Sequence, residues 1–270
     1  MRRLPLRWRE TYALGRDGET AQDMSEPKPP TAAAVLVAAG ESTRMRSSSG
    51  GVRKPLMRLA GRALVEHACA AFDAAPSVGA LVIVAHRDDV ETLERLARTS
   101  PAMRRVIRVV AGGAQRTDSV RAGVEAAPAH FDVVLVHDAA RPLITPAVIE
   151  SAVALAAREG AALVAAPVSD TLKRSSDGLR AEATLEREHV WAAQTPQAFR
   201  ASLLRELLAR AQRESFTPTD DAALYERYVG PIPLVRGERS NLKVTVPEDL
   251  VIAEAILAQR ASETRRESNA

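Results

Sequence analysis

Short, continuously apolar runs alternate along this chain with longer segments whose apolar residues follow helical spacing. Apolar strands without polar alternation are typical of a sheet covered on both faces, and strands that alternate with helices favour βαβ units. The sequence therefore predicts an α/β domain built on a mostly parallel sheet. The expected strands are 33–38, 80–85, 106–110, 132–137, 162–166 and 232–236, and the expected helices lie near 63–75, 88–98, 117–126, 146–158, 199–213, 220–228 and 247–260.

Composition narrows the class of partner. A net charge of +3 suggests a nucleic-acid ligand only weakly, several arginines lie in the terminal segments, and 3% aromatic residues offer bases no stacking platform. No apolar run approaches the ~20 residues that span a bilayer. We therefore expect neither a nucleic-acid nor a membrane partner. Cys69 is the only cysteine of the 270 residues, which fits a reducing, cytoplasmic location, and its apolar neighbours predict a buried thiol.

Two polar segments flank the expected domain. Residues 1–30 end in EPKPP and predict a disordered extension, within which translation could instead begin at Met24. Residues 31–260 form one domain in this interpretation, and residues 261–270 form a polar tail.

A third segment interrupts the βα pattern. Residues 167–193 carry a DG turn between short β-prone pieces and have no long apolar face, so we expect a projecting β-arm. Such an arm can swap onto a neighbouring subunit and form a homodimer, or it can close as a flap over its own site. The sequence leaves both alternatives open.

The first chemistry-bearing segment follows the first expected strand. Small residues at 38–40 let backbone N–H groups approach phosphate oxygens, and Arg44 and Lys54 could neutralise a triphosphate. The segment has no G-x-G-x-x-G, and Lys54 precedes Pro55 rather than the Ser or Thr of a Walker loop. We interpret it as a triphosphate-binding loop, with an ordinary turn and two solvated bases as the alternative.

Three further segments carry candidate ligands. Residues 112–119 (GGAQRTDS) join a glycine pair to a helix cap, which predicts a backbone surface for a base or ribose, or simply a capped turn. Asp138 ends a strongly apolar strand and could hold a hydrated Mg²⁺, while Arg141 could receive a phosphate. The alternative is an Asp138–Arg141 ion pair, with His137 as a structural neighbour rather than a base. Lys243, in NLKVT, follows the last expected strand.

Together these segments resemble the 2-C-methyl-D-erythritol 4-phosphate cytidylyltransferases of non-mevalonate isoprenoid synthesis. The resemblance runs from about residue 33 to residue 258, and eight motifs occur in the family's order. They are AAGESTRM, RKPLMRLAGRALVEHA, GGAQRTDSV, VHDAARP, APVSDTLKR, TLER…VWAAQTPQAF, TPTDDAALYE and NLKVTVPEDL.

The resemblance implies a fold and a reaction. The fold is a doubly wound, Rossmann-like sheet of the nucleotide-diphospho-sugar transferase type. The reaction joins CTP and 2-C-methyl-D-erythritol 4-phosphate to give 4-diphosphocytidyl-2-C-methyl-D-erythritol and pyrophosphate, with a divalent metal such as Mg²⁺. Two alternatives remain open: a ribitol 5-phosphate cytidylyltransferase, and a non-catalytic nucleotide-binding regulator. The regulator predicts loss of Arg44, Lys54 or Lys243, and all three are present.

The resemblance also implies residue roles. Those expected to contact CTP and stabilise its phosphates are Ala38, Ala39, Gly40, Arg44, Lys54, Gly113 and Ser119, with Asp138 at the metal and ribose. Those expected to hold the methylerythritol phosphate are Arg141, Thr171, Thr195, Thr219 and Lys243. Arg187, in the arm, is expected to reach a neighbouring subunit's substrate and, with Lys243, to position the attacking phosphate.

The chain departs from the family pattern in one loop. Ser42 stands where many members have a second glycine, and SSSGGVR lengthens the connection between Arg44 and Lys54. We interpret the added Ser and Gly as extra mobility in a loop that orders on binding CTP, with an impaired loop as the alternative.

Overall fold

The computed structural model describes residues 29–41 and 51–268. Arg44, Ser42 and nearly all of the expected N-terminal extension lie outside the described residues. The predictions that concern them are therefore not examined by the structure.

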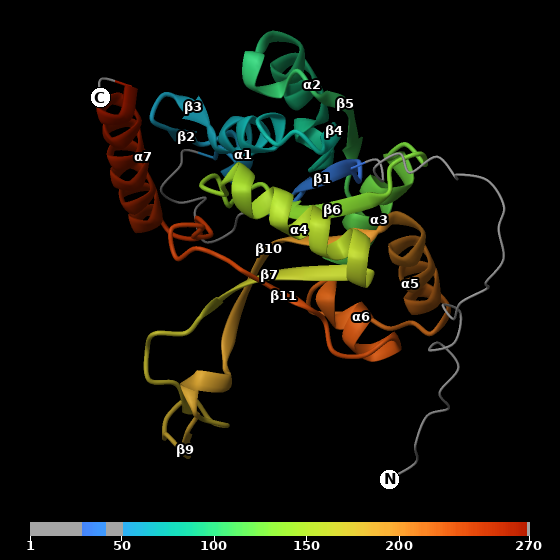
Figure 1. Cartoon of the computed structure of the whole chain (residues 1–270), viewed down its shortest axis with the longest axis vertical. Helices are drawn as coiled ribbons and strands as arrows, with labels where there is room; N and C mark the ends of the chain where they lie inside the picture. Colours follow the sequence, from blue (N-terminus) through green and yellow to red (C-terminus); the bar gives the residue numbers. More distant parts are fainter. Residues whose placement is uncertain (1–28, 42–50, 269–270) are drawn as a thin grey trace, which may run out of the picture.

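A seven-stranded sheet forms the centre of the described chain (Figure 1). Its spatial order is β11-β7-β10-β6-β1-β4-β5, and β10 runs antiparallel to both of its neighbours while the other pairs are parallel. These strands are β1 (Ala32–Ala38), β4 (Val78–Ala85), β5 (Val106–Ala111), β6 (Val133–Asp138), β7 (Ala161–Pro167), β10 (Trp191–Arg200) and β11 (Leu234–Arg236). A small pair, β2 (Arg58–Leu59) and β3 (Arg62–Ala63), lies outside the sheet.

The helices follow the expected segments closely. They are α1 (Leu64–Asp73), α2 (Val90–Thr99), α3 (Arg116–Ala126), α4 (Pro146–Glu159), α5 (Ala201–Arg213), α6 (Ala222–Tyr228) and α7 (Pro247–Ser268). Short 3-10 turns are η2 (Lys54–Leu56), η3 (Arg87–Asp89), η4 (Pro101–Met103) and η5 (Arg187–His189). Helix α7 continues beyond residue 260 to Ser268, so most of the expected polar tail is helical.

Helices cover both faces of the sheet, which explains the continuously apolar strands. Leu36 and Leu135 face α1 and α4 in one core cluster, whereas Val35 and Val134 face α3 and α5 in another. Each interior strand therefore buries both of its faces. The predicted doubly wound, mostly parallel α/β fold is confirmed.

Strand β10 is missing from the predicted strands, and the prediction is wrong there. Three of the residues 194–197 (QTPQ) are polar, so this stretch does not form an apolar run, yet all four are buried. Gln194, Thr195 and Gln197 each hydrogen-bond a group outside the strand: the Glu238 carbonyl, the His137 ring and the Asp220 carboxylate. Hydrogen bonds to residues distant in sequence thus allow polar side chains to be buried in this strand, and a search for apolar runs does not find it.

The predicted β-arm is present between β7 and β10. Its hairpin pairs β8 (Lys173–Arg174) with β9 (Ala183–Thr184), and Gly178 of the DG turn has a φ of 70°. Figure 1 shows the arm projecting away from the sheet and helices. The strand β10 begins at Trp191, so the last three residues assigned to the arm pair with β7 instead.

Within the described residues, no helix combines the length and apolar character needed to cross a membrane.

Close packing of α3 on the sheet depends on a glycine. A methyl group at Gly123 would collide with Val35 and would lie 2.7 Å from Val84 Cγ2. We predict that Gly123→Ala lowers the free energy of unfolding by about 1–2 kcal/mol, because overpacking outweighs the roughly 1 kcal/mol gained in helix propensity. Urea denaturation measures this change. Glu125→Ala, on the exposed face of α3, is the control and should change the free energy by less than about 0.5 kcal/mol. A stabilised Gly123→Ala variant would contradict this packing account.

Candidate active site

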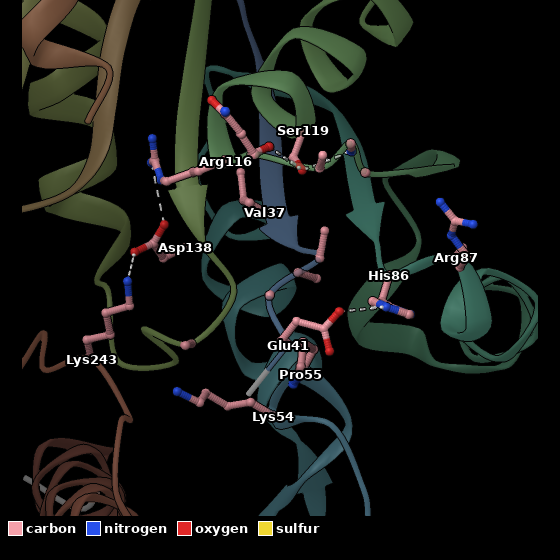
Figure 2. Close-up of a pocket in the computed structure, with 18 residues that line it drawn as sticks. Val37, Glu41, Lys54, Pro55, His86, Arg87, Arg116, Ser119, Asp138 and Lys243 are labelled. Carbon is pink, nitrogen blue, oxygen red and sulfur yellow. Dashed lines mark hydrogen bonds and ion pairs between the residues drawn. The ribbon is translucent and has the colours of Figure 1, made fainter. Parts of the chain in front are cut away.

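A pocket of about 590 Å³ opens at the carboxyl ends of the parallel strands β1, β4, β5 and β6 (Figure 2). The chain crosses from β5 to β6, on the other side of β1, and ligands of open α/β sheets bind at such a switch point. The predicted residues that line it are Ala38, Ala39, Gly40, Lys54, Gly113, Ser119, Asp138 and Lys243. Its lining also includes Glu41, His86, Arg87, Gln115 and Arg116.

Two loops of the pocket meet because Gly112 has no side chain. A Cβ there would lie 2.5 Å from the Ala39 Cβ and 2.7 Å from the Ser119 Oγ. The Gly112 N–H donates to the Ala85 carbonyl at 2.8 Å, which fixes the loop at the end of β4. The small residues after β1 and the glycine pair after β5 thereby form one continuous wall.

The loop from Gly113 to Ser119 is held by its own hydrogen bonds. The Ser119 hydroxyl accepts from the Gly113 N–H and donates to the Gln115 carbonyl, each at 3.2 Å, and the Gln115 N–H donates to the Asp118 carboxylate at 3.2 Å. Two N–H groups that we expected to face a ligand are therefore used inside the loop. Ser119, 3% exposed, shapes this wall of the pocket.

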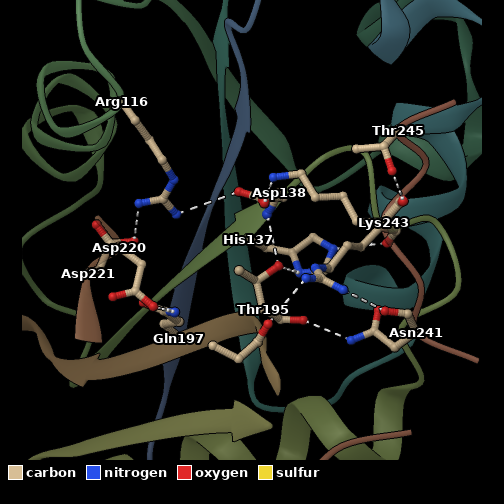
Figure 3. Close-up of polar contacts among 12 residues, drawn as sticks. Arg116, His137, Asp138, Thr195, Gln197, Asp220, Asp221, Asn241, Lys243 and Thr245 are labelled. Carbon is tan, nitrogen blue, oxygen red and sulfur yellow. Dashed lines mark hydrogen bonds and ion pairs between the residues drawn. The ribbon is translucent and has the colours of Figure 1, made fainter. Parts of the chain in front are cut away.

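Asp138, at the end of β6, is the centre of a chain of alternating charges (Figure 3). The Lys243 Nζ lies 2.6 Å from one carboxylate oxygen and the Arg116 Nη2 lies 3.5 Å from the other. Arg116 in turn donates from Nη1 to Asp221 at 2.8 Å. Burial alone would raise the pKa of Asp138, but Lys243 and Arg116 together hold it below its ordinary value.

The alternative ion pair between Asp138 and Arg141 does not form. Arg141 donates from Nη1 to the Asn241 carbonyl at 2.7 Å, while the described partners of the Asp138 carboxylate are Lys243 and Arg116. Asp138 therefore pairs with cations that come from distant parts of the chain.

Arg116 is one of several lining residues that the sequence motifs did not assign to the site. It opens α3 directly after the glycine loop, where an arginine also reads as an ordinary helix residue. Its partner Asp221 is 1% exposed, and burial raises the pKa of that carboxyl despite the neighbouring guanidinium. Next to it, Asp220 accepts from Gln197 of β10 at 2.8 Å, which fixes the start of α6 to the sheet.

Lys243 is placed by buried anchors on both sides. The Asn241 side chain, 1% exposed, donates to Gln194 at 3.1 Å and to the Thr195 carbonyl at 3.0 Å. The Val244 N–H donates to the Ala140 carbonyl at 2.8 Å, next to the end of β6. This segment carries Lys243 to Asp138 from 105 residues away.

A chain of buried hydrogen bonds through His137 and Thr195 orients the backbone of Asp138. His137 Nε2 lies 3.1 Å from the Arg141 carbonyl, which can only accept, so this nitrogen carries the proton. The Thr195 hydroxyl then donates to Nδ1 at 3.0 Å and accepts the Asp138 N–H at 3.1 Å. Burial lowers the pKa of His137 to about 4, so the ring is neutral at pH 7 and supports the structural assignment over a catalytic base.

The structure gathers some predicted residues and leaves others apart. Thr195, 4% exposed, and Arg141 lie beside Asp138 but do not line the pocket. Thr171 and Thr219 are exposed and also lie outside the lining, as does Arg187, whose Nη1 donates to the Ser169 carbonyl within the arm. The roles assigned to all five residues stay predictions.

The neutral state of buried His137 predicts a pH dependence of stability. In the folded protein the ring takes up its proton near pH 4, whereas in the unfolded chain it does so near 6.5. Protons therefore favour the unfolded chain between these values, and stability falls as the pH drops from 6.5 to 4. We expect His137 to account for about 3 kcal/mol of that loss.

Urea unfolding of the native protein and of His137→Gln across this pH range measures the effect. The variant lacks the titrating ring, so its stability should fall less steeply. Equal slopes would show that the ring is not held neutral.

Comparison with known proteins agrees with the geometry. The family model described as 2-C-methyl-D-erythritol 4-phosphate cytidylyltransferase matches residues 32–259. A protein of that name from Syntrophotalea carbinolica is 41% identical over 224 residues, which cover 83% of this chain and 94% of the relative.

Solved structures agree as well. The 2-C-methyl-D-erythritol 4-phosphate cytidylyltransferase of Thermus thermophilus has a TM-score of 0.68 at 32% identity and covers 84% of this chain and 98% of its own. The 4-diphosphocytidyl-2C-methyl-D-erythritol synthase of Anaerococcus prevotii has a TM-score of 0.73 at 26% identity, with coverage of 85% and 97%. The family match spans the strands, the pocket and the segment that carries Lys243, and the chain belongs to the 2-C-methyl-D-erythritol 4-phosphate cytidylyltransferase family.

Proposed function

We propose that the protein is a nucleotidyltransferase that joins CTP and 2-C-methyl-D-erythritol 4-phosphate to give 4-diphosphocytidyl-2-C-methyl-D-erythritol and pyrophosphate. The observation that carries this proposal is the pocket at the switch point, where the described lining residues include four cations, Lys54, Arg87, Arg116 and Lys243, and two carboxylates, Glu41 and Asp138. Both substrates are polyanions, so an excess of cations on a preformed surface suits them. The family supplies the identity of the substrates.

The chemistry needs charge neutralisation more than proton transfer. A phosphate oxygen of the acceptor attacks the α-phosphorus of CTP in line, the new O–P bond forms, and the bond to the β-phosphate oxygen breaks to release pyrophosphate. The attacking phosphate is already an anion, so no general base is required. Lys54 and Arg44 are proposed to stabilise the negative charge that develops around the α-phosphorus.

Lys243 is proposed to exchange partners during binding. Its Nζ lies 2.6 Å from the Asp138 carboxylate, and its side chain is 44% exposed. The acceptor phosphate offers a denser negative charge at the same pocket wall, so Lys243 turns toward it. Arg116, anchored by the buried Asp221, stays close to Asp138 and limits the cost of that exchange.

The donor set also fits a divalent ion held mainly by the substrate. The described residues contain no cluster of three or more His, Cys, Asp or Glu that could hold a metal alone. Mg²⁺ takes most of its ligands from water and phosphate oxygens and needs one or two carboxylates, and Asp138 is proposed as that carboxylate. A divalent ion held there would supply positive charge that neutralises part of the charge on the phosphates.

The acceptor is proposed to bind beyond Asp138, near Arg141 and Thr195. Arg141 spends Nη1 on the Asn241 carbonyl and has a longer contact of 3.4 Å from Nη2 to Ala193. The weaker Nη2 contact is the one that a phosphate would replace. Thr171 and Thr219 are proposed to complete this acceptor site.

The arm is proposed to complete the site of a second subunit in a homodimer. Arg187 is exposed and does not line the pocket of its own chain. Leu179, Leu185 and Trp191, in or next to the arm, expose 87%, 40% and 37% of their surface, which a partner could cover. This favours the swapped arm over a flap that closes on its own site.

A cytoplasmic location is proposed because the cysteine Cys69 is a free, buried thiol. Cys69 is buried in α1, and burial raises the pKa of its thiol well above the ordinary range. It is thus an inert core residue that needs no oxidising compartment.

Pyrophosphate release tests the function. With Mg²⁺ and CTP, the protein should release pyrophosphate in the presence of methylerythritol phosphate and much more slowly with ribitol 5-phosphate. Release with ribitol phosphate alone would assign the other acceptor. CTP binding without release from either acceptor would indicate the non-catalytic regulator.

Removal of the Lys54 charge tests the mechanism. We predict that Lys54→Ala lowers kcat by about 10²–10³, the range for one lost preorganised electrostatic group. Steady-state pyrophosphate release measures it, with circular dichroism to verify the fold. If turnover stays within threefold, Lys54 is not at the reacting phosphate.

A mixing experiment tests the shared site. Lys243→Ala and Arg187→Ala dimers are each expected to be nearly inactive, but when subunits are exchanged the mixed dimers regain one intact site. Random mixing should restore about a quarter of native activity if Arg187 acts across the interface. No recovery, after verified subunit exchange, would place Arg187 in its own subunit's site.

A further inference from the structure

A two-carboxylate clamp lies immediately before the predicted catalytic lysine. The Arg53 guanidinium donates from Nη2 to Asp88 at 2.7 Å and from Nη1 to Asp89 at 2.9 Å. Asp88 and Asp89 are consecutive residues of η3, and Arg53 caps η2, which begins at Lys54. One side chain therefore spans two turns that are about 35 residues apart in sequence.

The clamp connects two walls of the pocket. Lys54 enters the pocket from η2, whereas His86 and Arg87 enter it from the end of β4 and from η3. Within η2, Pro55 is buried, and at its end the Met57 N–H donates to the Lys54 carbonyl at 3.0 Å. The backbone of Lys54 is thus fixed by buried packing after it and by the clamp before it.

Burial distinguishes this clamp from an ordinary surface ion pair. The side chains of Arg53 and Asp89 are each only 12% exposed, although Asp88 is 61% exposed. Burial by itself lowers the pKa of Arg53, but the two carboxylates more than offset it, and the pKa is raised. Since a guanidinium held by two acceptors has few alternative orientations, the contact restrains the backbone that bears it.

We propose that Arg53 is a positioning residue for Lys54 and that it acts through Asp88 and Asp89. The inference rests on the proposed function, in which Lys54 contacts the reacting phosphate of CTP. A displacement of about 1 Å at a catalytic group can cost up to 10²-fold in rate. A restraint on the residue before Lys54 therefore changes turnover without itself contacting a substrate.

A double-mutant cycle tests the proposal. We expect Arg53→Gln to lower kcat by about tenfold or more, and Arg53→Lys, which keeps the charge but not the fork, to lower it as well. If Arg53 acts through Lys54, adding Arg53→Gln to Lys54→Ala should change kcat by less than threefold. Quenched assays with labelled CTP measure the slow variants, and urea denaturation gives the stability of each.

Arg104 supplies a control with the same number of carboxylate contacts, on a side chain that is 70% exposed. It makes a two-contact ion pair with Asp73, with its Nε and Nη2 each 2.9 Å from a carboxylate oxygen, and it does not line the pocket. Arg104→Gln should leave kcat within twofold. Equal losses from Arg53→Gln in the native and Lys54→Ala backgrounds, or a kcat within twofold of native for Arg53→Gln, would overturn the proposal.

A second measurement separates this proposal from the proposed function. If the native protein releases no pyrophosphate with methylerythritol phosphate, the function fails, and the same cycle is then followed in the Kd for CTP with Mg²⁺. Arg53→Gln should weaken CTP binding in the native background and not in the Lys54→Ala background. Additive effects on that Kd would overturn the clamp by themselves.

Discussion

The ion pairs of Asp138 are the interaction on which the rest of the site depends. One carboxylate at the carboxyl end of β6 lies 2.6 Å from the Lys243 Nζ and 3.5 Å from the Arg116 Nη2. The Thr195 hydroxyl, on β10, accepts the backbone N–H of Asp138. The Asn241 side chain donates to the Thr195 carbonyl and so holds the segment that carries Lys243. Strand β6, strand β10 and the segment before α7 therefore all contribute groups that hold Asp138 or pair with it.

Asp138 lies between two of the cations in the pocket, Lys243 and Arg116. Like charges in a confined pocket repel one another, and the Asp138 carboxylate offsets that repulsion. In the proposed mechanism a polyanionic substrate takes over the same role, and binding exchanges one set of charge contacts for another. His137 adds no charge at neutral pH because burial lowers the pKa of its ring, and its two hydrogen bonds hold Thr195 and the Arg141 carbonyl.

The sequence predicts the strands and loops whose residues form a recognisable pattern within a short segment. The apolar runs located six of the seven strands of the sheet, and the segments after them supplied Asp138 and the loops around Gly40 and Gly113. Strand β10 escaped prediction because its buried glutamines and threonine are satisfied by partners distant in sequence. Arg116 and Arg53 were not predicted for the same reason. Arg116 pairs with Asp221, and Arg53 pairs with Asp88 and Asp89, and these partners are distant in sequence.

A crystal structure with CTP, Mg²⁺ and methylerythritol phosphate bound in an inactive variant such as Lys54→Ala tests the account most directly. The measurement is the distance from the Lys243 Nζ to the Asp138 carboxylate, which is 2.6 Å in the present structure. The account predicts that Nζ moves onto a phosphate oxygen of the acceptor while Arg116 remains paired with Asp221. A Lys243 that stays on Asp138, with the acceptor phosphate bound elsewhere, would contradict the exchange of charges at the centre of this mechanism.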